Sequence, residues 1–427
     1  MYEKLAYNNL IIKYLILSLP VLLITGPLLP EIAIGIIFFL IIYKIIKKEI
    51  KDFNKNFIYI FLFFFFFIIV SSLLSDYVLL SATKTGFYIR FLTLTLSIYY
   101  ILNNSNNFLI LLKNTLLIIF FILIFDGFYQ YFFYENIIGM TNLNKSRISS
   151  FFGEELIYGS FLSKFFPILI GLLIFFHRNN VDKILIYLMI CLSVIAIFIS
   201  GERASFILTL ISLIIIIIST NFFSKSKFYI LIVMSIGIWI IASSNQVLKE
   251  KWQLTISNTI SNFSNKIVIE DKKYFLILDK KYTYMGLSAI KMFNDKPILG
   301  HGVKSFRFNC KKVRYRTDEF NTYNFRLNCG NHPHNTYVQL IAETGVVGFS
   351  FIIFFFIFIF FSLLKSFFSN QKKKFPNAFD LRICILSCIF INLFPFTTTG
   401  SFFNNWLSII YFFPIGFLFY LNKIYKF

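Results

Sequence analysis

The chain has 427 residues, of which 57% are hydrophobic and 60 are Phe, and its formal net charge is +21. A water-soluble domain of this length does not need so much apolar surface, so the composition indicates one large helical membrane domain. The basic residues lie in short clusters between apolar runs rather than in one stripe. This arrangement excludes an ordinary nucleic-acid-binding domain and is typical of a membrane protein with positively charged connections.

Twelve apolar runs along the chain are candidates for crossing a bilayer. They lie near residues 11–28, 32–46, 57–74, 84–103, 108–126, 157–176, 183–200, 203–221, 228–244, 336–364, 381–397 and 403–422. We therefore predict an all-α polytopic membrane protein with about twelve transmembrane helices, nine within residues 1–244 and three within residues 336–427. The first run could be a signal peptide, but it ends in GPLLP without a small-residue cleavage site, so we interpret it as the first helix.

The charge of the connections predicts the topology. If the N-terminus is cytoplasmic, every even-numbered connection is cytoplasmic, and these connections carry lysine clusters such as KIIKKEIKDFNKN and KSFFSNQKKKF. The short odd-numbered connections, such as GPLLPE and SGER, are nearly free of Lys, and long connections escape the retention rule. Positive charge is retained on the cytoplasmic side, so we expect both termini there and the odd-numbered connections on the outer side.

Two outer connections are long, near residues 127–156 and 245–335. The second is large enough to be a small domain, and we expect it to be partly helical, with a helix that ends at Asp295–Pro297. It holds 16 Lys and Arg against 7 Asp and Glu. Two interpretations stay open for this charge: attraction to anionic lipid headgroups, or a binding site for an anion such as phosphate.

The cysteines divide between the two environments. Cys191, Cys384 and Cys388 lie in apolar runs and are expected to behave as small hydrophobic residues. Cys310 and Cys329 lie in the large outer connection. An oxidising compartment would permit a disulfide between them, and two free thiols are the alternative.

The segment CGNHPHNTYVQLIAETGVVGF holds two of the four histidines, His332 and His334, next to an apolar run. If Pro333 occupies the first turn of a helix, His334 shares one helical face with Gly345 and Gly348, which let a neighbouring helix approach. An imidazole at the membrane surface suits a general base, and an interfacial histidine without a role is the alternative. The paired spacings typical of zinc sites are missing, so we expect no metal.

Arginines near the outer side are candidates for binding an anion. Arg203, in SGERASFILTL, lies at the outer tip of a helical hairpin, where it could face a cavity, pair with Glu202 or reach lipid headgroups. Gly300 and Gly302 predict a turn that brings backbone N–H groups close to an anion. The other basic candidates are Arg90, Arg147, Lys280, Lys281, Arg307, Arg314 and Arg316. The chain has no phosphate loop of the ATPase type and no nucleophile elbow, so any substrate is expected to arrive already activated.

These motifs resemble those of the O-antigen ligase family, whose superfamily also includes O-antigen polymerases and protein O-oligosaccharyltransferases. His334 and Asn335 are followed by nine residues and then by Gly345-Val346-Val347-Gly348, which matches the late signature of the family. KPILGHGVKSF resembles the family's Pro-x-x-Gly-x-Gly turn, SGERASFILTLISL its Ser-Gly-x-Arg span, and RISSFFGEELIYGSFL its first outer-loop motif. The motifs cover about residues 145–355.

The resemblance implies a metal-independent inverting glycosyltransferase without a cofactor, in the bacterial inner membrane and with its active site facing the periplasm. The donor would be a glycan on undecaprenyl diphosphate, and the acceptor lipid A–core, another glycan or a protein. Arg203 would bind the diphosphate, and His334 would act as the base. The family's second essential arginine is replaced by Lys280 and Lys281, so one of the loop arginines could take its role. A transporter is the alternative of another class, although the chain lacks the internal repeats typical of one.

Overall fold

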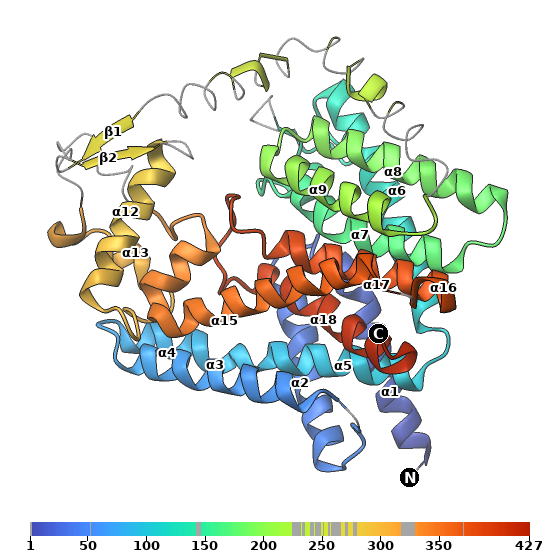
Figure 1. Ribbon diagram of the computed structural model, residues 1–427, viewed down its shortest axis with the longest axis horizontal. Helices are drawn as coiled ribbons and strands as arrows, with labels where there is room; N and C mark the ends of the chain where they lie inside the picture. The colour runs from blue at the N-terminus through green and yellow to red at the C-terminus, as the bar shows by residue number, and fades with distance from the viewer. Residues whose placement is uncertain are drawn as a thin grey trace.

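The computed structural model describes residues 2–51, 53–141, 147–223, 280–316, 329–369 and 371–427, together with the strands at 266–269 and 272–275 and scattered residues between 232 and 257. Helices dominate this part of the chain (Figure 1). They are α1 (Tyr2–Leu22), α2 (Leu28–Ile46), α3 (Lys55–Leu73), α4 (Val78–Gly86), α5 (Arg90–Asn104), α6 (Phe108–Phe133), α7 (Tyr158–Phe176), α8 (Asn180–Ile199), α9 (Arg203–Ser219), α12 (Lys280–Asp295), α13 (Phe306–Asn309), α15 (Thr336–Phe367), α16 (Gln371–Lys374), α17 (Pro376–Asn392) and α18 (Asn405–Tyr425).

The helical membrane character predicted from the composition is confirmed. Within the described residues, eight helical segments are long and apolar enough to cross a membrane, and two further apolar helices, at Tyr7–Leu22 and Arg203–Ser219, are shorter. The predicted ninth span, at 228–244, falls largely outside the described residues, so the number twelve stays a prediction. One feature was not predicted: β1 (Lys266–Ile269) and β2 (Lys272–Phe275) pair as an antiparallel hairpin.

The membrane core is centred on four helices that are buried along most of their length. α7 packs along α17, and α18 packs along α5. Large apolar side chains on α2 and α3 point outward instead; Phe39, Phe63 and Phe66 are each more than half exposed. Exposed aromatic rings on such helices are expected to contact lipid, because a monomeric soluble protein rarely leaves them in water.

A second, smaller core lies outside the membrane helices, at the end where α15 begins (Figure 1). It is built from α12, α13 and the residues that follow them, and α15 contributes Ala342. Its buried members are Met285, Ala289, Met292, Phe306, Cys310, Tyr315 and Ala342. The C-terminal part of the large outer connection therefore has an apolar centre of its own, and the helix expected to end at Asp295–Pro297 is α12.

The odd-numbered connections lie together at this same end. The backbone N–H of Ile148, from the α6–α7 connection, donates to the carbonyl of Ser200 between α8 and α9, at 3.3 Å. The indole N–H of Trp406, at the start of α18, donates to the carbonyl of Leu23 in the α1–α2 turn, at 3.3 Å. The chain therefore gathers these connections into one surface, and the assignment of that surface to the periplasm stays a prediction.

The even-numbered connections meet elsewhere. The carboxylate of Asp380, near the start of α17, accepts the backbone N–H groups of Asn221 and Phe222 at 2.9 and 3.0 Å. The ammonium of Lys13 donates to Asn107, between α5 and α6, at 2.8 Å. These polar links join even-numbered connections to neighbouring helices.

The start of α15 differs from the prediction. The N-cap is Asn335, whose side-chain oxygen accepts the N–H groups of Tyr337 and Val338, so Pro333 lies before the helix rather than in its first turn. His334 adopts a left-handed backbone conformation with φ 55°. An amide oxygen caps the free N–H groups of a helix better than a proline ring can, because proline offers no acceptor on its side chain. The predicted single helical face from His334 to Gly348 is therefore wrong.

Candidate active site

The two glycine motifs of the sequence form one structural unit. The turn at residues 297–302 docks into a break in α15 at Gly345, where φ is 63° and ψ is −162°. The N–H of Val346 donates to the carbonyl of Pro297 at 2.9 Å, and the N–H of Gly302 donates to the carbonyl of Glu343 at 2.8 Å. The turn therefore takes over hydrogen bonds that an unbroken helix would make within itself.

Both motifs need glycine because the two backbones touch. A Cβ on Gly345 would collide with the carbonyl groups of Pro297 and Ile298, and a Cβ on Gly300 would collide with the backbone of Glu343 and Thr344. Both glycines also have positive φ, at 63° and 68°. The prediction that Gly345 admits a neighbouring helix is thus corrected: a turn from the outer connection approaches it.

Glu343 anchors this unit and was missed by sequence reasoning. Its fully buried carboxylate accepts the backbone N–H groups of Lys304 and Phe306 at 2.9 and 3.2 Å, and the side-chain amide of Gln339 at 2.9 Å. The oxygen of the same amide accepts the N–H of Phe402 at 2.8 Å. The sequence does contain a signal for Glu343, because it is a carboxylate inside an otherwise apolar run. Such a group is costly in a membrane helix and normally has a functional or structural role.

The histidines are held by the connection between α17 and α18. The rings of His332 and His334 lie 4.2 Å apart between centroids, and the ring of Tyr282 from α12 lies 5.2 Å from His334. The N–H of Thr399 donates to the carbonyl of His334 at 2.8 Å, and the Nε2 of His332 lies 3.2 Å from the carbonyl of Thr399. Main-chain groups of one residue therefore fix both histidines.

Burial, together with the neighbouring His334, Arg307 and Lys304, lowers the pKa of His332 from 6.5 to about 4. His332 is therefore neutral at physiological pH. A neutral ring beside His334 limits the positive charge of the pair when His334 takes up a proton.

His332 also makes the stability of the protein depend on pH. Between about pH 6.5 and 4 the unfolded chain binds a proton that the folded protein does not, so the free energy of unfolding falls as the pH drops through this window. We expect the thermal midpoint of the purified protein to decline over this range, and to decline less in His332→Gln. Equal declines in the two proteins would contradict the assignment.

Two cations lie beside the histidines. Lys304 is half-buried, has a left-handed backbone with φ 59°, and has its pKa lowered by burial and by the nearby Lys84 and Arg307. The Nε of Arg307 is buried and makes no hydrogen bond within the described part of the chain. Within the described residues the side chains of Lys304 and Arg307 form no salt bridge, and half-buried cations that repel one another form a setting suited to an anion.

Two of the other predicted arginines, Arg90 and Arg147, have structural roles. Arg90 donates to Asn405 at 2.7 Å and pairs with Glu31 at 3.2 Å, so it ties α5 to α18 and α2. Arg147 donates to the carbonyl of Leu156 at 3.1 Å, within the α6–α7 connection.

Arg203 is the first residue of α9 and is exposed, next to cavity-lining residues described below. Arg314 pairs with Asp295 at 3.4 Å, and Arg316 donates to the carbonyl of Lys311 at 3.0 Å. Lys280 and Lys281 begin α12, but their side chains lie outside the described residues.

Cys310 and Cys329 are joined as a disulfide with a Cα–Cα distance of 5.3 Å. The bond connects the small core to the residues just before His332. Closing a loop between residues 19 apart in sequence is worth about 3 kcal/mol.

We expect Cys310→Ser combined with Cys329→Ser to lower the thermal midpoint, because the unfolded chain is no longer restricted by the loop. The check is thermal unfolding with and without a reductant, to which the double variant should be insensitive. Cys191→Ser, at a half-buried free thiol, is the matched control. A variant as stable as the parent would show that the disulfide does not brace this region.

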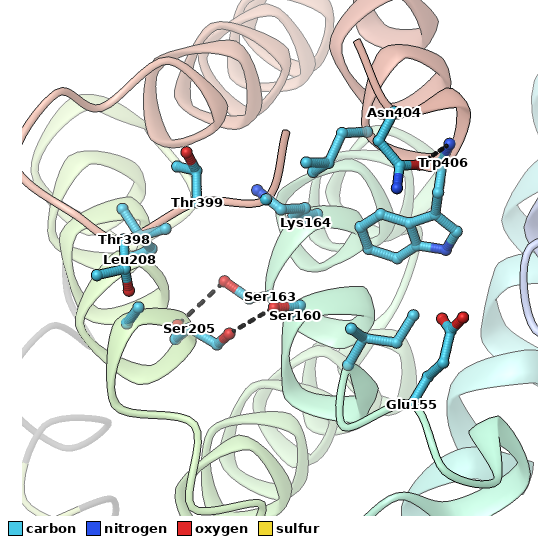
Figure 2. Close-up of a pocket in the computed structure, with 14 residues that line it drawn as sticks. Glu155, Ser160, Ser163, Lys164, Ser205, Leu208, Thr398, Thr399, Asn404 and Trp406 are labelled. Atoms are coloured by element: carbon cyan, nitrogen blue, oxygen red, sulfur yellow. Dashed lines mark hydrogen bonds between the residues drawn. The ribbon is translucent and has the colours of Figure 1, made fainter. Parts of the chain in front are cut away.

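Three adjoining cavities surround the start of α18, and all of them are lined by Asn404 and Trp406. The first, which we name the Trp406 cavity, has a volume of about 170 Å³ (Figure 2). Its polar lining comes from Glu155, Ser160, Ser163, Lys164, Ser205, Thr398, Thr399 and Asn404. It also reaches Ala204, next to Arg203, and Thr399 links it to the histidines. Another of the three cavities reaches Lys304.

Among the described residues, no three histidine, cysteine or carboxylate side chains are grouped as ligands for a common metal ion. The absence of a metal from the reaction stays a prediction.

Comparison with known proteins agrees with the motifs. Residues 187–353 match the family model described as O-antigen ligase, a segment that includes Arg203, the glycine turn, His334 and Gly345. No curated protein matches the chain. Residues 187–353 of the chain are therefore similar to the O-antigen ligase family, in agreement with the resemblance of the motifs.

Proposed function

We propose that the protein transfers a glycan from undecaprenyl diphosphate to a hydroxyl of an acceptor such as lipid A–core, on the periplasmic side of the bacterial inner membrane. One observation carries the proposal. Within the segment that matches the family, the docked glycine turn leads into Lys304 and Arg307, whose charges act on His332, the ring neighbour of His334. A base next to two cations is the arrangement that glycosyl transfer from a diphosphate requires.

In the proposed reaction, His334 takes the proton of the acceptor hydroxyl while that oxygen attacks the anomeric carbon. The bond from this carbon to the diphosphate oxygen breaks, and the diphosphate leaves with the electron pair. The attack comes from the face opposite the leaving group, so the configuration is inverted. Charge builds up on the leaving oxygen, and fixed cations lower the barrier by stabilising it there.

The structure supports a choice among the cations. Lys304 and Arg307 act on the pKa of His332, whereas Arg314 and Arg316 already bond to Asp295 and to a backbone carbonyl. We therefore propose Lys304 and Arg307 for the role of the missing second arginine, with Arg203 as the other diphosphate-binding residue. Arg307 offers the paired donors that a lysine lacks.

The test is transfer by the purified protein in lipid nanodiscs, with lipid-linked glycan as donor, lipid A–core as acceptor and EDTA present. We expect a new glycolipid and released undecaprenyl diphosphate. Movement of donor across the bilayer without a new glycosidic bond would instead indicate a transporter. Transfer that stops when EDTA is added would contradict a metal-independent reaction.

The O-antigen polymerase and protein O-oligosaccharyltransferase activities belong to the same superfamily, and a deletion strain separates them from ligation. Loss of a ligase leaves long lipid-linked polymer that is not attached to the core. Loss of a polymerase leaves a single repeat on the core, and loss of an oligosaccharyltransferase leaves lipopolysaccharide unchanged.

A further inference from the structure

Trp406 is held rigidly at the centre of the three cavities. Its indole N–H donates to the carbonyl of Leu23 at 3.3 Å, and its backbone N–H is capped by the side-chain oxygen of Asn404 at 2.9 Å. The indole bond orients the ring, and the Asn404 bond caps the start of the helix that carries it. Its faces offer a large apolar surface, on which the C–H face of a pyranose ring can pack.

Hydrogen-bond acceptors face the Trp406 cavity from α7 and α9. The hydroxyls of Ser160 and Ser205 both donate to the carboxylate of Glu202, at 2.8 and 3.0 Å, and the hydroxyl of Ser163 donates to the carbonyl of Ser205 at 3.1 Å. Because these protons are used inside the protein, the oxygens are left with lone pairs for a ligand. Glu155 adds an exposed carboxylate, so the wall suits a ligand rich in hydroxyl donors.

Lys164 supplies a cation to this wall. It lies on α7, is only 8% exposed, and its ammonium makes one hydrogen bond in the described part of the chain, to the side-chain oxygen of Asn392 at 3.1 Å. An ammonium has three donors, so a ligand can take the others. A lysine within a membrane helix is costly and is normally retained for a substrate or an ion.

We propose that the Trp406 cavity is a sugar subsite that selects an acidic pyranose, with Trp406 as the stacking platform and Lys164 as the partner of the sugar carboxylate. The proposal rests on the proposed function for the identity of the sugar as part of the transferred or accepting glycan. It adds a substrate class that the family match does not specify.

Charge distinguishes this subsite from the diphosphate site. A diphosphate carries at least two negative charges, whereas the Trp406 cavity offers one ammonium and also exposes Glu155. A single sugar carboxylate can pair with the ammonium of Lys164, while the sugar hydroxyls donate to Glu155 and to the serine oxygens. The cavity on the other side of Trp406 reaches Lys304, so a sugar and its diphosphate can lie in neighbouring cavities.

The experiment compares two matched probes, methyl β-D-glucopyranoside and methyl β-D-glucopyranosiduronic acid, which differ only at one carbon substituent. Binding to the full-length protein in nanodiscs is titrated by saturation-transfer NMR. We expect the acidic glycoside to bind about tenfold more tightly, the effect of one charge-assisted hydrogen bond. This preference should vanish in Lys164→Met and persist in Lys164→Arg.

The second part of the experiment removes the Trp406 ring. Trp406→Ala should lose binding of both glycosides, whereas Trp252→Phe, whose ring packs on Phe198 and Phe206, should bind both as before. Equal binding of the two probes by the unmodified protein, no saturable binding of either, or a preference that survives Lys164→Met would overturn the proposal. The first two outcomes need no variant, so they hold even if a variant fails to fold.

The assay is independent of transfer. If the glycosides bind as expected but no glycan is transferred, the proposed function fails and the sugar subsite stands. In an active preparation, Lys164→Met should raise the KM for one substrate only, and that substrate, donor or acceptor, is the one whose sugar occupies the cavity.

Discussion

Replacement of His334 by alanine is expected to lower glycan transfer by about 10²–10⁴-fold, the usual contribution of a general base. The imidazole would otherwise take the proton of the attacking hydroxyl, and no other described histidine is placed to do so except His332, whose pKa of about 4 makes it a poor base at neutral pH. The measurement is initial transfer rate at saturating donor, together with the amount of protein in the membrane. Added imidazole should restore part of the rate.

His177→Ala is the matched control. His177 lies between α7 and α8, with its ring 4.9 Å from that of Phe222, among the even-numbered connections. We expect its rate to be unchanged. A His334→Ala protein that transfers glycan at the parental rate would remove His334 from the mechanism.

Gly345→Ala is expected to lower transfer by at least about tenfold and to reduce stability, although no side chain of the site is changed. A backbone with φ 63° and ψ −162° is open almost only to glycine, and another residue there costs about 1–3 kcal/mol. The new methyl group would also push the carbonyls of Pro297 and Ile298 away. The turn would then carry Lys304 and Arg307 away from the histidines.

Gly286→Ala separates this effect from a general sensitivity to added methyl groups. Gly286 lies within α12, and a Cβ there would meet nothing within 4 Å. Alanine favours a helix over glycine, so stability should be unchanged or slightly increased. Transfer rates and thermal midpoints of the two variants, measured side by side, decide the matter. Similar behaviour of Gly345→Ala and Gly286→Ala would contradict the docked turn.

Local patterns predicted the helices, and they supplied most of the residues proposed for the site. Apolar runs predicted the membrane helices, because the length and composition of a helix decide whether it can lie in lipid. Lysine-rich connections separated two sets of turns, which the structure gathers at different places. The contact between the glycine turn and α15 could not be predicted, because residues 297–302 and Gly345 are brought together only by the tertiary fold.

Other errors have particular causes. The helix start was placed at Pro333 because proline favours a first turn, yet Asn335 makes the better cap. Glu343 was not identified because it is a single polar residue in an apolar run. Trp406 was not identified because the chain is rich in aromatic residues. Their importance comes from partners far along the chain, such as Lys304 and Leu23, which no spacing reveals.

Thr399 holds the two histidines through its main chain, whereas the side chains of Thr398, Thr399 and Asn404 line the Trp406 cavity. On the proposed roles, substitutions at the cavity-lining positions of this connection change which glycan fits while the two histidines stay in place. A lineage whose surface sugars change under selection could adapt by substituting these cavity-lining residues one at a time. The proposed transfer reaction would stay the same while the glycan changes.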